Sequence, residues 1–320
     1  MRYALLALLC LATAAVAAEG DLMRAVVLGD DGGVKVKSLL RPEPQAGQVR
    51  IKVRAASVNP VDWKLAARAR SGAIPGMDLA GVIDAVGPEA GDWKRGQAVI
   101  AVAPTGSYAE YALASVKAVA VKPARLSFEE AAGLPIVGET AWRTMVTVAD
   151  VKPGQRVLIH GGAGGVGSLA VQIAKEQGAH VIATASPEHA ALVHSLGAEQ
   201  VIDYHSVRFE DQVHDMDVVL NTVDPQIGIR SIKVVKPGGI LVSVVGPPPA
   251  DQCAAAKIRC AIPGRVTGEM LAQVSELAAK GRLQVHIDRQ LSMDQVAEAW
   301  DLSKKGHTGG KLIIEVSHDQ

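Results

Sequence analysis

At the centre of the chain stands Arg156-Val-Leu-Ile-His-Gly-Gly-Ala-Gly-Gly-Val-Gly-Ser168, an apolar run that breaks into closely spaced glycines and then into helix-forming residues. The stretch predicts a strand, a phosphate-binding turn and a helix. Gly162, Gly164 and Gly167 form a G-x-G-x-x-G pattern, which allows a tight turn, close approach of backbone N–H groups to a pyrophosphate, and helix-strand packing. A second apolar run at residues 180–184 completes the unit. A dinucleotide site is therefore favoured over a plain glycine-rich turn.

The residue after this second strand distinguishes the two nicotinamide dinucleotides. An acidic residue there binds the ribose 2′-hydroxyl of NAD and repels a 2′-phosphate. This chain instead has Thr184, Ala185 and Ser186. The sequence favours NADP, and the alternative is that the missing acid only weakens NAD binding without creating a phosphate site.

Length and composition limit the possible classes. A chain of 320 residues is long enough for two ordinary domains. Lys plus Arg and Asp plus Glu are equal at 33 each, so no basic field attracts nucleic acid. An aromatic content of only 3%, with abundant small aliphatic residues, is typical of buried parallel strands covered by helices.

The N-terminus differs from the rest of the chain. Arg2 precedes an apolar run at residues 4–16, which ends in small residues. This pattern predicts a secretory signal peptide over residues 1–18 and a periplasmic or secreted mature protein. No stable membrane anchor is expected, because the run is short for a membrane span. The alternative is a cytoplasmic protein that starts at Met23, since an ordinary first strand follows it.

Two cysteines remain after such a cleavage. Cys253 and Cys260 are seven positions apart, and in an oxidising compartment they could form a disulfide. Two buried free thiols are an equal alternative, because pairing requires a geometry that the sequence does not define.

The pattern along the chain predicts an α/β protein of two domains. Short β-branched runs such as residues 48–54 and 80–86, split by Gly, Pro and Asp, predict a β-rich domain. Ser127 and Glu130 then form a capping box, after which strands and helices alternate as in a doubly wound parallel sheet. The predicted strands of this sheet are residues 156–160, 180–184, 200–203, 218–222 and 240–245.

The predicted domain boundaries follow from this change of pattern. Residues 23–130 form the β-rich substrate domain, and residues 131–282 form the Rossmann domain. Residues 283–320 contain one more strand at 311–316 and are predicted to return to the first domain.

Several motifs in a fixed order carry a resemblance to a known family. They are Ala56-Ser-Val-Asn-Pro-Val-Asp-Trp-Lys64, Pro75-Gly-Met-Asp-Leu-Ala-Gly81, Gly106-Ser-Tyr-Ala-Glu-Tyr111, Ala131-Ala-Gly-Leu-Pro135, the glycine turn, Ser195-Leu-Gly-Ala198, Val201-Ile-Asp-Tyr204 and Gly306-His-Thr-Gly-Gly-Lys311. Together they resemble the medium-chain dehydrogenase/reductases, specifically the zinc-free quinone oxidoreductase branch, over residues 23–316. The resemblance implies a GroES-like barrel domain, a Rossmann domain, a cleft between them and a homodimer.

The resemblance also bears on metal chemistry. Asn59, Met77 and Ile136 stand where zinc-dependent relatives have their three catalytic ligands, and they do not form a good zinc ligand set. The implied reaction is hydride transfer from NADPH to a quinone or an α,β-unsaturated carbonyl. In that reaction a hydrogen-bond donor stabilises the oxygen that gains charge.

Three residues near the first motif are the predicted catalytic residues. Asn59 matches the family's cleft amide beside the nicotinamide, or is a turn residue before Pro60. Asp62 is a cleft acid, or the cap of a helix that begins at Trp63. Lys64 orients a substrate oxygen, or is a solvated helix lysine.

The predicted cofactor-binding residues are Thr140, Gly162, Gly164, Gly165, Val166, Gly167, Ser186, His189, Tyr204 and Lys311. Of these, Ser186, His189 and Tyr204 match the family's contacts to the 2′-phosphate. A histidine replaces the usual lysine or arginine and is only partly charged at neutral pH. NADPH affinity is therefore expected to rise as pH falls toward 6, unless His189 is simply an exposed helix residue.

The sequence thus predicts an NADPH-dependent, zinc-independent reductase of quinones or enones. The alternative is an exported cofactor-binding or partner-binding protein on the same fold with little turnover, because a fold does not guarantee activity.

Overall fold

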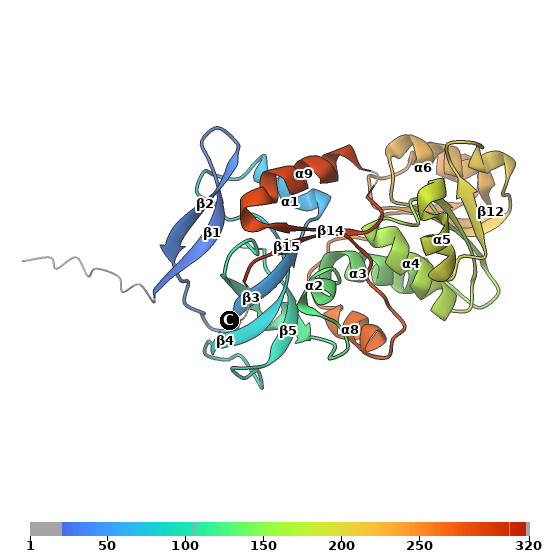
Figure 1. The fold of residues 1–320 in the computed structure, drawn as a ribbon. Helices are drawn as coiled ribbons and strands as arrows, with labels where there is room; N and C mark the ends of the chain where they lie inside the picture. Colours follow the sequence, from blue (N-terminus) through green and yellow to red (C-terminus); the bar gives the residue numbers. More distant parts are fainter. Residues whose placement is uncertain (1–20, 105, 307, 318–320) are drawn as a thin grey trace, which may run out of the picture.

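The computed structural model describes residues 21–104, 106–306 and 308–317. The segment predicted to be a signal peptide lies outside these residues. Figure 1 shows two lobes side by side, one built mainly from the N-terminal third of the chain and the other from its middle part.

The first lobe is built on a largely antiparallel sheet. Its strands are β3 (Gln48–Ser57), β4 (Asp78–Val86), β5 (Ala98–Val102), β6 (Tyr111–Ser115), β7 (Val119–Val121), β14 (Ile287–Ser292) and β15 (Lys311–Glu315). They follow the order β14-β15-β3-β4-β5-β7, and β6 also pairs with β3. Along β3, Val49, Ile51 and Val53 alternate into one core, as the two-residue period of a strand requires.

The two ends of the described chain meet on this lobe. The hairpin of β1 (Leu22–Leu28) and β2 (Val34–Leu40) is joined to the lobe where Val26 N donates to Tyr108 O at 2.9 Å. Strand β15 pairs antiparallel with β3, so the C-terminal segment lies in the first sheet. Helix α9 (Val296–Lys305) contacts α1 (Pro60–Ala66) beside it (Figure 1).

The second lobe holds a six-stranded parallel sheet. Its strands are β8 (Arg156–Ile159), β9 (His180–Ala185), β10 (Gln200–Asp203), β11 (Met216–Asn221), β12 (Val235–Ser243) and β13 (Arg259–Ala261). The order β10-β9-β8-β11-β12-β13 is the Rossmann order, with the chain reversing its direction of progress between β8 and β11. The predicted doubly wound sheet is confirmed.

Helices cover both faces of this sheet. Those that contact its strands are α4 (Gly165–Glu176), α5 (Ala190–Ser195), α6 (Pro225–Ser231) and α7 (Ala250–Ala255). Helix α3 (Pro135–Trp142) packs against α4, and α8 (Leu271–Ala279) packs against α3 and β7. Helix α2 (Phe128–Ala132) packs against β3 and β4 of the first lobe. In β8, Val157 and Ile159 face the core that contains α3, α4 and α8, whereas Leu158 faces the opposite core around Phe209. Because both faces are buried, the strand is apolar from Val157 to Ile159, and only the half-buried Arg156 at its start is polar.

The local signals in the sequence correspond to real features. Ser127 Oγ accepts a bond from Glu130 N at 3.1 Å, and the Glu130 carboxylate accepts one from Ser127 N at 2.9 Å, so α2 begins with the predicted capping box. Cys253 in α7 and Cys260 in β13 form a disulfide with Cα atoms 6.1 Å apart. The structure therefore decides between the two alternatives that the sequence left open.

The short strands β13 and β14 have no counterpart among the predicted elements. Three-residue β13 lies at the edge of its sheet, and the exposed positions in β14 interrupt its apolar pattern. Both strands depend on a neighbouring strand for their hydrogen bonds, which a local pattern does not reveal.

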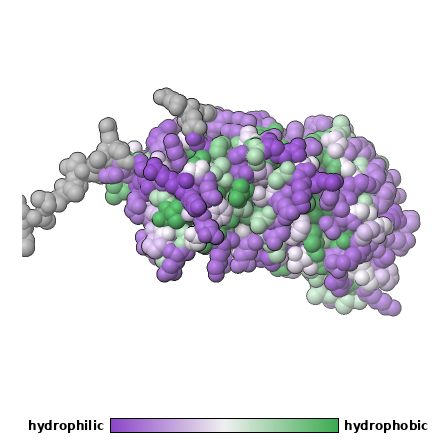
Figure 2. Space-filling view, turned by 90° about the horizontal axis from the view of Figure 1, so that it is seen from below, coloured by the Kyte–Doolittle hydropathy of each residue, from purple (hydrophilic) through white to green (hydrophobic). Residues whose placement is uncertain are grey.

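The surface is largely polar. Figure 2 shows a face on which hydrophilic residues predominate and apolar residues form separate small areas. In the part of the chain that the structure describes, no helix has the length and apolar character needed to cross a membrane.

Candidate active site

The glycine turn has the shape that a dinucleotide requires. Gly161 has a positive φ of 72°, a conformation that glycine adopts without strain. A Cβ on Gly167 would lie 2.1 Å from Gly161 O, and one on Gly162 would lie 2.8 Å from the Ala183 side chain. Helix α4 begins at Gly165, so its first N–H groups lack helical acceptors and face the turn. These residues fit a bound pyrophosphate.

A cavity of about 560 Å³ opens at the carboxyl ends of the central strands. It borders the point between β8 and β11 where the strand order reverses, which is where open α/β sheets bind ligands. Its lining comprises His160, Gly161, Ala163, Gly164, Thr184, Ala185, Ser186, His189, Tyr204, Val207, Phe209, Thr222, Val223, Asp224, Ile227, Arg230, Lys305, Gly306 and Thr308. Because β9 and β10 belong to the first mononucleotide half of the sheet, this cavity suits the adenosine half of a dinucleotide.

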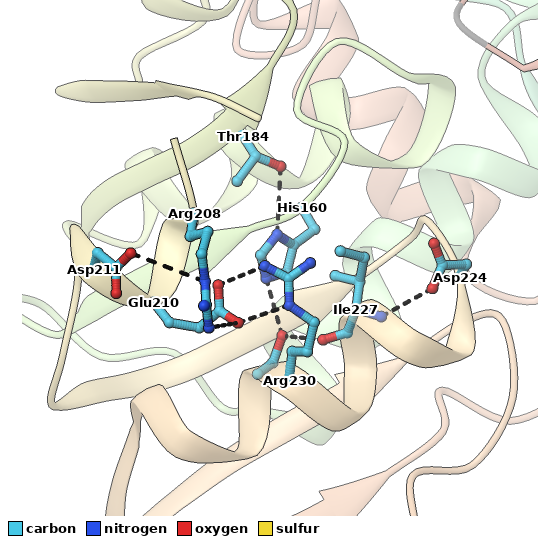
Figure 3. A network of polar contacts seen from close by, with 9 residues as sticks. His160, Thr184, Arg208, Glu210, Asp211, Asp224, Ile227 and Arg230 are labelled. Atoms are coloured by element: carbon cyan, nitrogen blue, oxygen red, sulfur yellow. Dashed lines mark hydrogen bonds and ion pairs between the residues drawn. The ribbon is translucent and has the colours of Figure 1, made fainter. Parts of the chain in front are cut away.

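His160 forms a neutral wall of this cavity. It is 1% exposed, and its ring nitrogens lie 3.3 Å from Thr184 Oγ1 and 3.0 Å from Ser231 Oγ. Burial, together with the charge of Arg230, lowers the pKa of His160 to about 3. The imidazole is therefore uncharged near neutrality and acts as a hydrogen-bonded spacer (Figure 3).

A charged pair stiffens the outer wall of the cavity. Two guanidinium nitrogens of Arg230 donate to the Glu210 carboxylate at 2.6 Å each, and Arg208 lies 3.7 Å from the same carboxylate. These bonds lower the pKa of Glu210 to about 2. Figure 3 shows Arg230 and Arg208 gathered around the Glu210 carboxylate. The Arg230 guanidinium also lies 4.9 Å from the Phe209 ring centre. The wall thus presents a flat cation held in one orientation.

Three predicted 2′-phosphate contacts come together at one corner of the cavity. Ser186 Oγ lies 2.9 Å from His189 Nδ1, and Tyr204 borders the same cavity. The sequence interpretation missed Glu188, whose carboxylate accepts a bond from Ser186 Oγ at 3.2 Å. A phosphate bound to this hydroxyl would meet that carboxylate as a competitor for the same hydrogen bond.

A second cluster is buried around Asn59, which is 2% exposed. The Asn59 amide donates through Nδ2 to Asp78 at 2.8 Å and accepts from Lys311 Nζ at 2.7 Å. Asp78 also accepts from Ser57 Oγ and from Ile136 N, the latter at 3.0 Å. An amide therefore bridges a buried acid and a buried amine that come from opposite ends of the chain.

Burial shifts both ionisable partners of this amide. Removal from water raises the pKa of Asp78 to about 6, although the charge of Lys311 opposes the shift. Burial likewise lowers the pKa of Lys311, although the negative charges of Asp78 and Asp62 oppose this shift. A Cβ on Gly165 would lie 3.0 Å from Lys311 Cδ, so the lysine stem runs along the start of α4. Lys311 thus touches both the pyrophosphate turn and the cleft amide.

Asp62 lies behind this cluster. The helix begins at Pro60 rather than at Trp63, so Asn59 is its N-cap, and Asp62 is the third helical residue, whose carboxylate closes the capping box. Its Oδ2 accepts from Asn59 N and from Tyr108 Oη, each at 2.8 Å. Burial raises the pKa of Asp62 to about 7 and that of Tyr108 well above its usual range. The carboxylate is therefore used to fix the start of α1 against the core of the first lobe.

The remaining two predicted residues occupy different positions. Lys64 is exposed, with its Nζ 5.3 Å from the Trp63 ring centre, and the structure does not bring it to Asn59. Thr140 lies on α3, where its hydroxyl donates to Ile136 O at 2.7 Å, one turn from the contact between Ile136 and Asp78.

Asp78 is the main residue that the sequence interpretation missed. It is fully buried at the start of β4 and lies within the motif Pro75-Gly-Met-Asp-Leu-Ala-Gly81. An acidic side chain at the start of an apolar, buried strand needs hydrogen-bond partners. Its position in the sequence could therefore have indicated a buried polar cluster.

Comparison with known families agrees with this architecture. Residues 45–124 match the alcohol dehydrogenase GroES-like domain, and residues 196–314 match the zinc-binding dehydrogenase domain. Residues 137–240 match the C-terminal domain of alanine dehydrogenase/PNT. The predicted GroES-like domain and Rossmann domain are both confirmed.

Individual proteins are similar along nearly the whole chain. The 2-methylene-furan-3-one reductase of Solanum lycopersicum is 35% identical, over 91% of this chain and 79% of its own. The NADPH-dependent alkenal/one oxidoreductase of Arabidopsis thaliana is 34% identical over the same shares. The quinone oxidoreductase structure from Coxiella burnetii superposes with a TM-score of 0.83 at 34% identity, covering 92% of this chain and 100% of that one. The chain belongs to the medium-chain dehydrogenase/reductase superfamily, in its quinone oxidoreductase-like branch.

Proposed function

We propose that this chain reduces quinones or α,β-unsaturated carbonyls with NADPH, by hydride transfer and without zinc. The observation that carries the proposal is the position of Lys311, whose stem lies along the glycine turn and whose ammonium bonds Asn59. One side chain thus connects the cofactor turn with a hydrogen-bonding cluster in the cleft. The similar proteins named above reduce substrates of these two classes, which supports the same assignment.

In the proposed reaction the cofactor supplies the hydride, and the protein binds the cofactor and stabilises charge on the substrate. NADPH, when bound, supplies the hydride. The start of α4 binds the pyrophosphate, and Ser186, His189 and Tyr204 offer donors to the 2′-phosphate. One N–H of the Asn59 amide goes to Asp78, which leaves a second donor on the same nitrogen for a substrate oxygen. Such a fixed donor stabilises the negative charge that the oxygen gains during conjugate reduction.

Support for zinc independence comes from the donor set. Asn59, Met77 and Ile136 offer an amide, a thioether and a hydrocarbon, which do not suit zinc. The Lys311 amine bonds Asn59 Oδ1 at 2.7 Å, so a metal ion at that oxygen would compete with a lysine. Within residues 21–104, 106–306 and 308–317, no group of three His, Cys, Asp or Glu side chains could hold a metal.

A direct assay tests the proposed reaction. Purified protein is mixed with NADPH and a panel of small quinones and enones, and loss of nicotinamide absorbance is followed, with NADH in parallel and with a chelator in matched samples. We expect turnover with NADPH that the chelator leaves unchanged. Binding of NADPH without turnover would favour a binding protein, and activity that disappears with the chelator would overturn zinc independence.

We also propose that the mature protein is exported. The apolar N-terminal segment supports this, as does the disulfide between Cys253 and Cys260, because disulfides persist in oxidising compartments. N-terminal sequencing of the native protein tests the proposal. A terminus at residue 18 or 19 supports export, and an intact Met23 terminus favours a cytoplasmic protein.

A homodimer is proposed through the edge of the parallel sheet. Among the described strands, β13 pairs only with β12, so its outer edge has backbone groups that could pair with a second copy. Ile262, which follows β13, is 53% exposed. Sedimentation of the parent and of an Ile262→Lys variant tests this, with a parent dimer and a weakened variant as the expected result. A monomeric parent would overturn it.

A further inference from the structure

Residues 262–270 form a loop between the two lobes, and we call it the 262–270 loop. It leaves the carboxyl end of β13 and leads into α8. Strands β11, β12 and β13 make up the second mononucleotide half of the sheet, whose carboxyl ends receive the nicotinamide side of a dinucleotide. The loop also reaches the first lobe, since a Cβ on Gly268 would lie 2.6 Å from the Ala118 side chain. The loop therefore connects the first lobe with the strands whose carboxyl ends receive the nicotinamide side.

A buried carboxylate holds the far end of this loop. Glu139 on α3 is 0% exposed, and its two oxygens accept bonds from Thr267 N at 3.1 Å and from Gly268 N at 2.6 Å. Gly268 has a positive φ of 86°. Two N–H groups of an irregular turn are thus satisfied by one acid that reaches it from another element, and bonds to a charged acceptor are the stronger kind.

A second side chain from the same helix holds the near end of the loop. Arg143, one turn after Glu139, donates through Nε to Pro263 O at 3.0 Å. The backbone from Arg143 to Val148 forms a π-helical turn, a distortion that is often found at functional sites. At its other end α3 receives the contact of Ile136 N with Asp78, the partner of Asn59. The helix therefore connects the cleft cluster to both ends of the loop.

We propose that Glu139 is a positioning residue for the nicotinamide half of NADPH, acting through the 262–270 loop. The inference rests on the cofactor assignment made above but not on the substrate. Without the carboxylate, the N–H groups of Thr267 and Gly268 lose their acceptor, and the loop moves away from the sheet. The adenosine half is unaffected, because its cavity lies at the other strands and neither Glu139 nor the loop lines it.

Comparison of two ligands isolates this effect. Calorimetry measures the Kd of NADPH and the Kd of 2′,5′-ADP, which contains only the adenosine half, for the parent, Glu139→Gln and Glu139→Ala. We expect about a tenfold weaker NADPH affinity in Glu139→Ala, equivalent to about 1.4 kcal/mol, and a smaller loss in Glu139→Gln. The affinity for 2′,5′-ADP should stay within about twofold of the parent value, since one lost acceptor affects only its own neighbourhood.

Asp217→Asn is the matched control. Asp217 Oδ2 accepts a bond from Arg156 N at 2.8 Å. This contact lies at the amino end of the same sheet, opposite the cofactor, so replacing the Asp217 carboxylate should leave the ratio of the two Kd values unchanged. An unchanged ratio in both Glu139 variants would overturn the proposal, as would an equal weakening of both ligands. If Glu139→Ala fails to fold, Glu139→Gln alone decides. Failure of the proposed reductase reaction would appear as absent turnover in the parent, with the binding ratio still measurable.

Discussion

Substitution of Gly167 by alanine tests the glycine turn most directly. The added Cβ would lie 2.1 Å from Gly161 O, 2.8 Å from Gly161 C and 3.1 Å from Gly162 Cα. All three are backbone atoms, so no side chain can rotate away. To remove this clash, the turn and the start of α4 must separate by more than 1 Å. Overpacking of this kind lowers the free energy of unfolding by about 1–3 kcal/mol.

The same movement should weaken cofactor binding. The pyrophosphate binds N–H groups on both sides of the turn, and loss of one hydrogen bond to a charged group costs about 1.5–3 kcal/mol. We therefore expect Gly167→Ala to lower the melting temperature by several degrees and NADPH affinity by about 10–100-fold. Scanning calorimetry and a fluorescence titration with NADPH measure the two effects.

Gly164→Ala is the discriminating control. Its Cβ would lie 3.4 Å from Gly161 O, which is an ordinary contact, so the fold should tolerate it. The added methyl group nevertheless blocks the approach of the pyrophosphate. We expect weaker NADPH binding at an unchanged melting temperature. The reasoning is refuted if Gly167→Ala keeps both the melting temperature and the NADPH affinity of the parent.

Three further predictions concern the buried acid Asp78, the cofactor contact His189 and the disulfide. Because the pKa of Asp78 is raised from 3.8 to about 6, native protein binds the proton more tightly, and stability is lost as pH rises from 4 to 6. Asp78→Asn has no such ionisable group. Between pH 4 and 7 the free energy of unfolding of the variant, measured with urea, should therefore increase by roughly 3 kcal/mol relative to that of the parent. A difference between the two proteins that does not change with pH would contradict this. His189→Ala should weaken the binding of NADPH and leave that of NADH unchanged at one pH, and equal losses for both cofactors would exclude His189 as a 2′-phosphate contact. Reduction of Cys253–Cys260 should cost about 2 kcal/mol, and any free thiol beyond that of Cys10 in unreduced, denatured protein would disprove the pairing.

Much of the fold was predictable because its signals are local. A strand buried on both faces must be apolar throughout, and a turn that packs against a helix must lack side chains, so the run from Arg156 to Ser168 predicts its own conformation. The capping box at Ser127 is local in the same sense. The edge strands β13 and β14 were not predictable, since each lacks a clear apolar pattern and is defined only by its pairing with β12 or β15.

The candidate site was predictable only in part. Gly162, Gly164 and Gly167 are identified by spacing alone, and Ser186, His189 and Tyr204 by their position after two strands. The interpretations of Asp62 and Lys64 remained open, because a sequence does not show which face of a short helix turns inward. The structure turns Asp62 to Tyr108 and leaves Lys64 exposed.

The sequence by itself determined the parallel sheet, the glycine turn and the absence of an acid after its second strand, since short-range periodicity and residue size specify them. Only the tertiary structure brought Asp78 and Lys311 to the two ends of the Asn59 amide, and Glu139 to the 262–270 loop. The contacts of Lys311 with Asn59 and of Glu139 with Gly268 join residues more than a hundred positions apart, and Asp78 comes from a different element than Asn59. Their partners are chosen by the need to satisfy buried polar groups after the two sheets have packed, which no local pattern encodes.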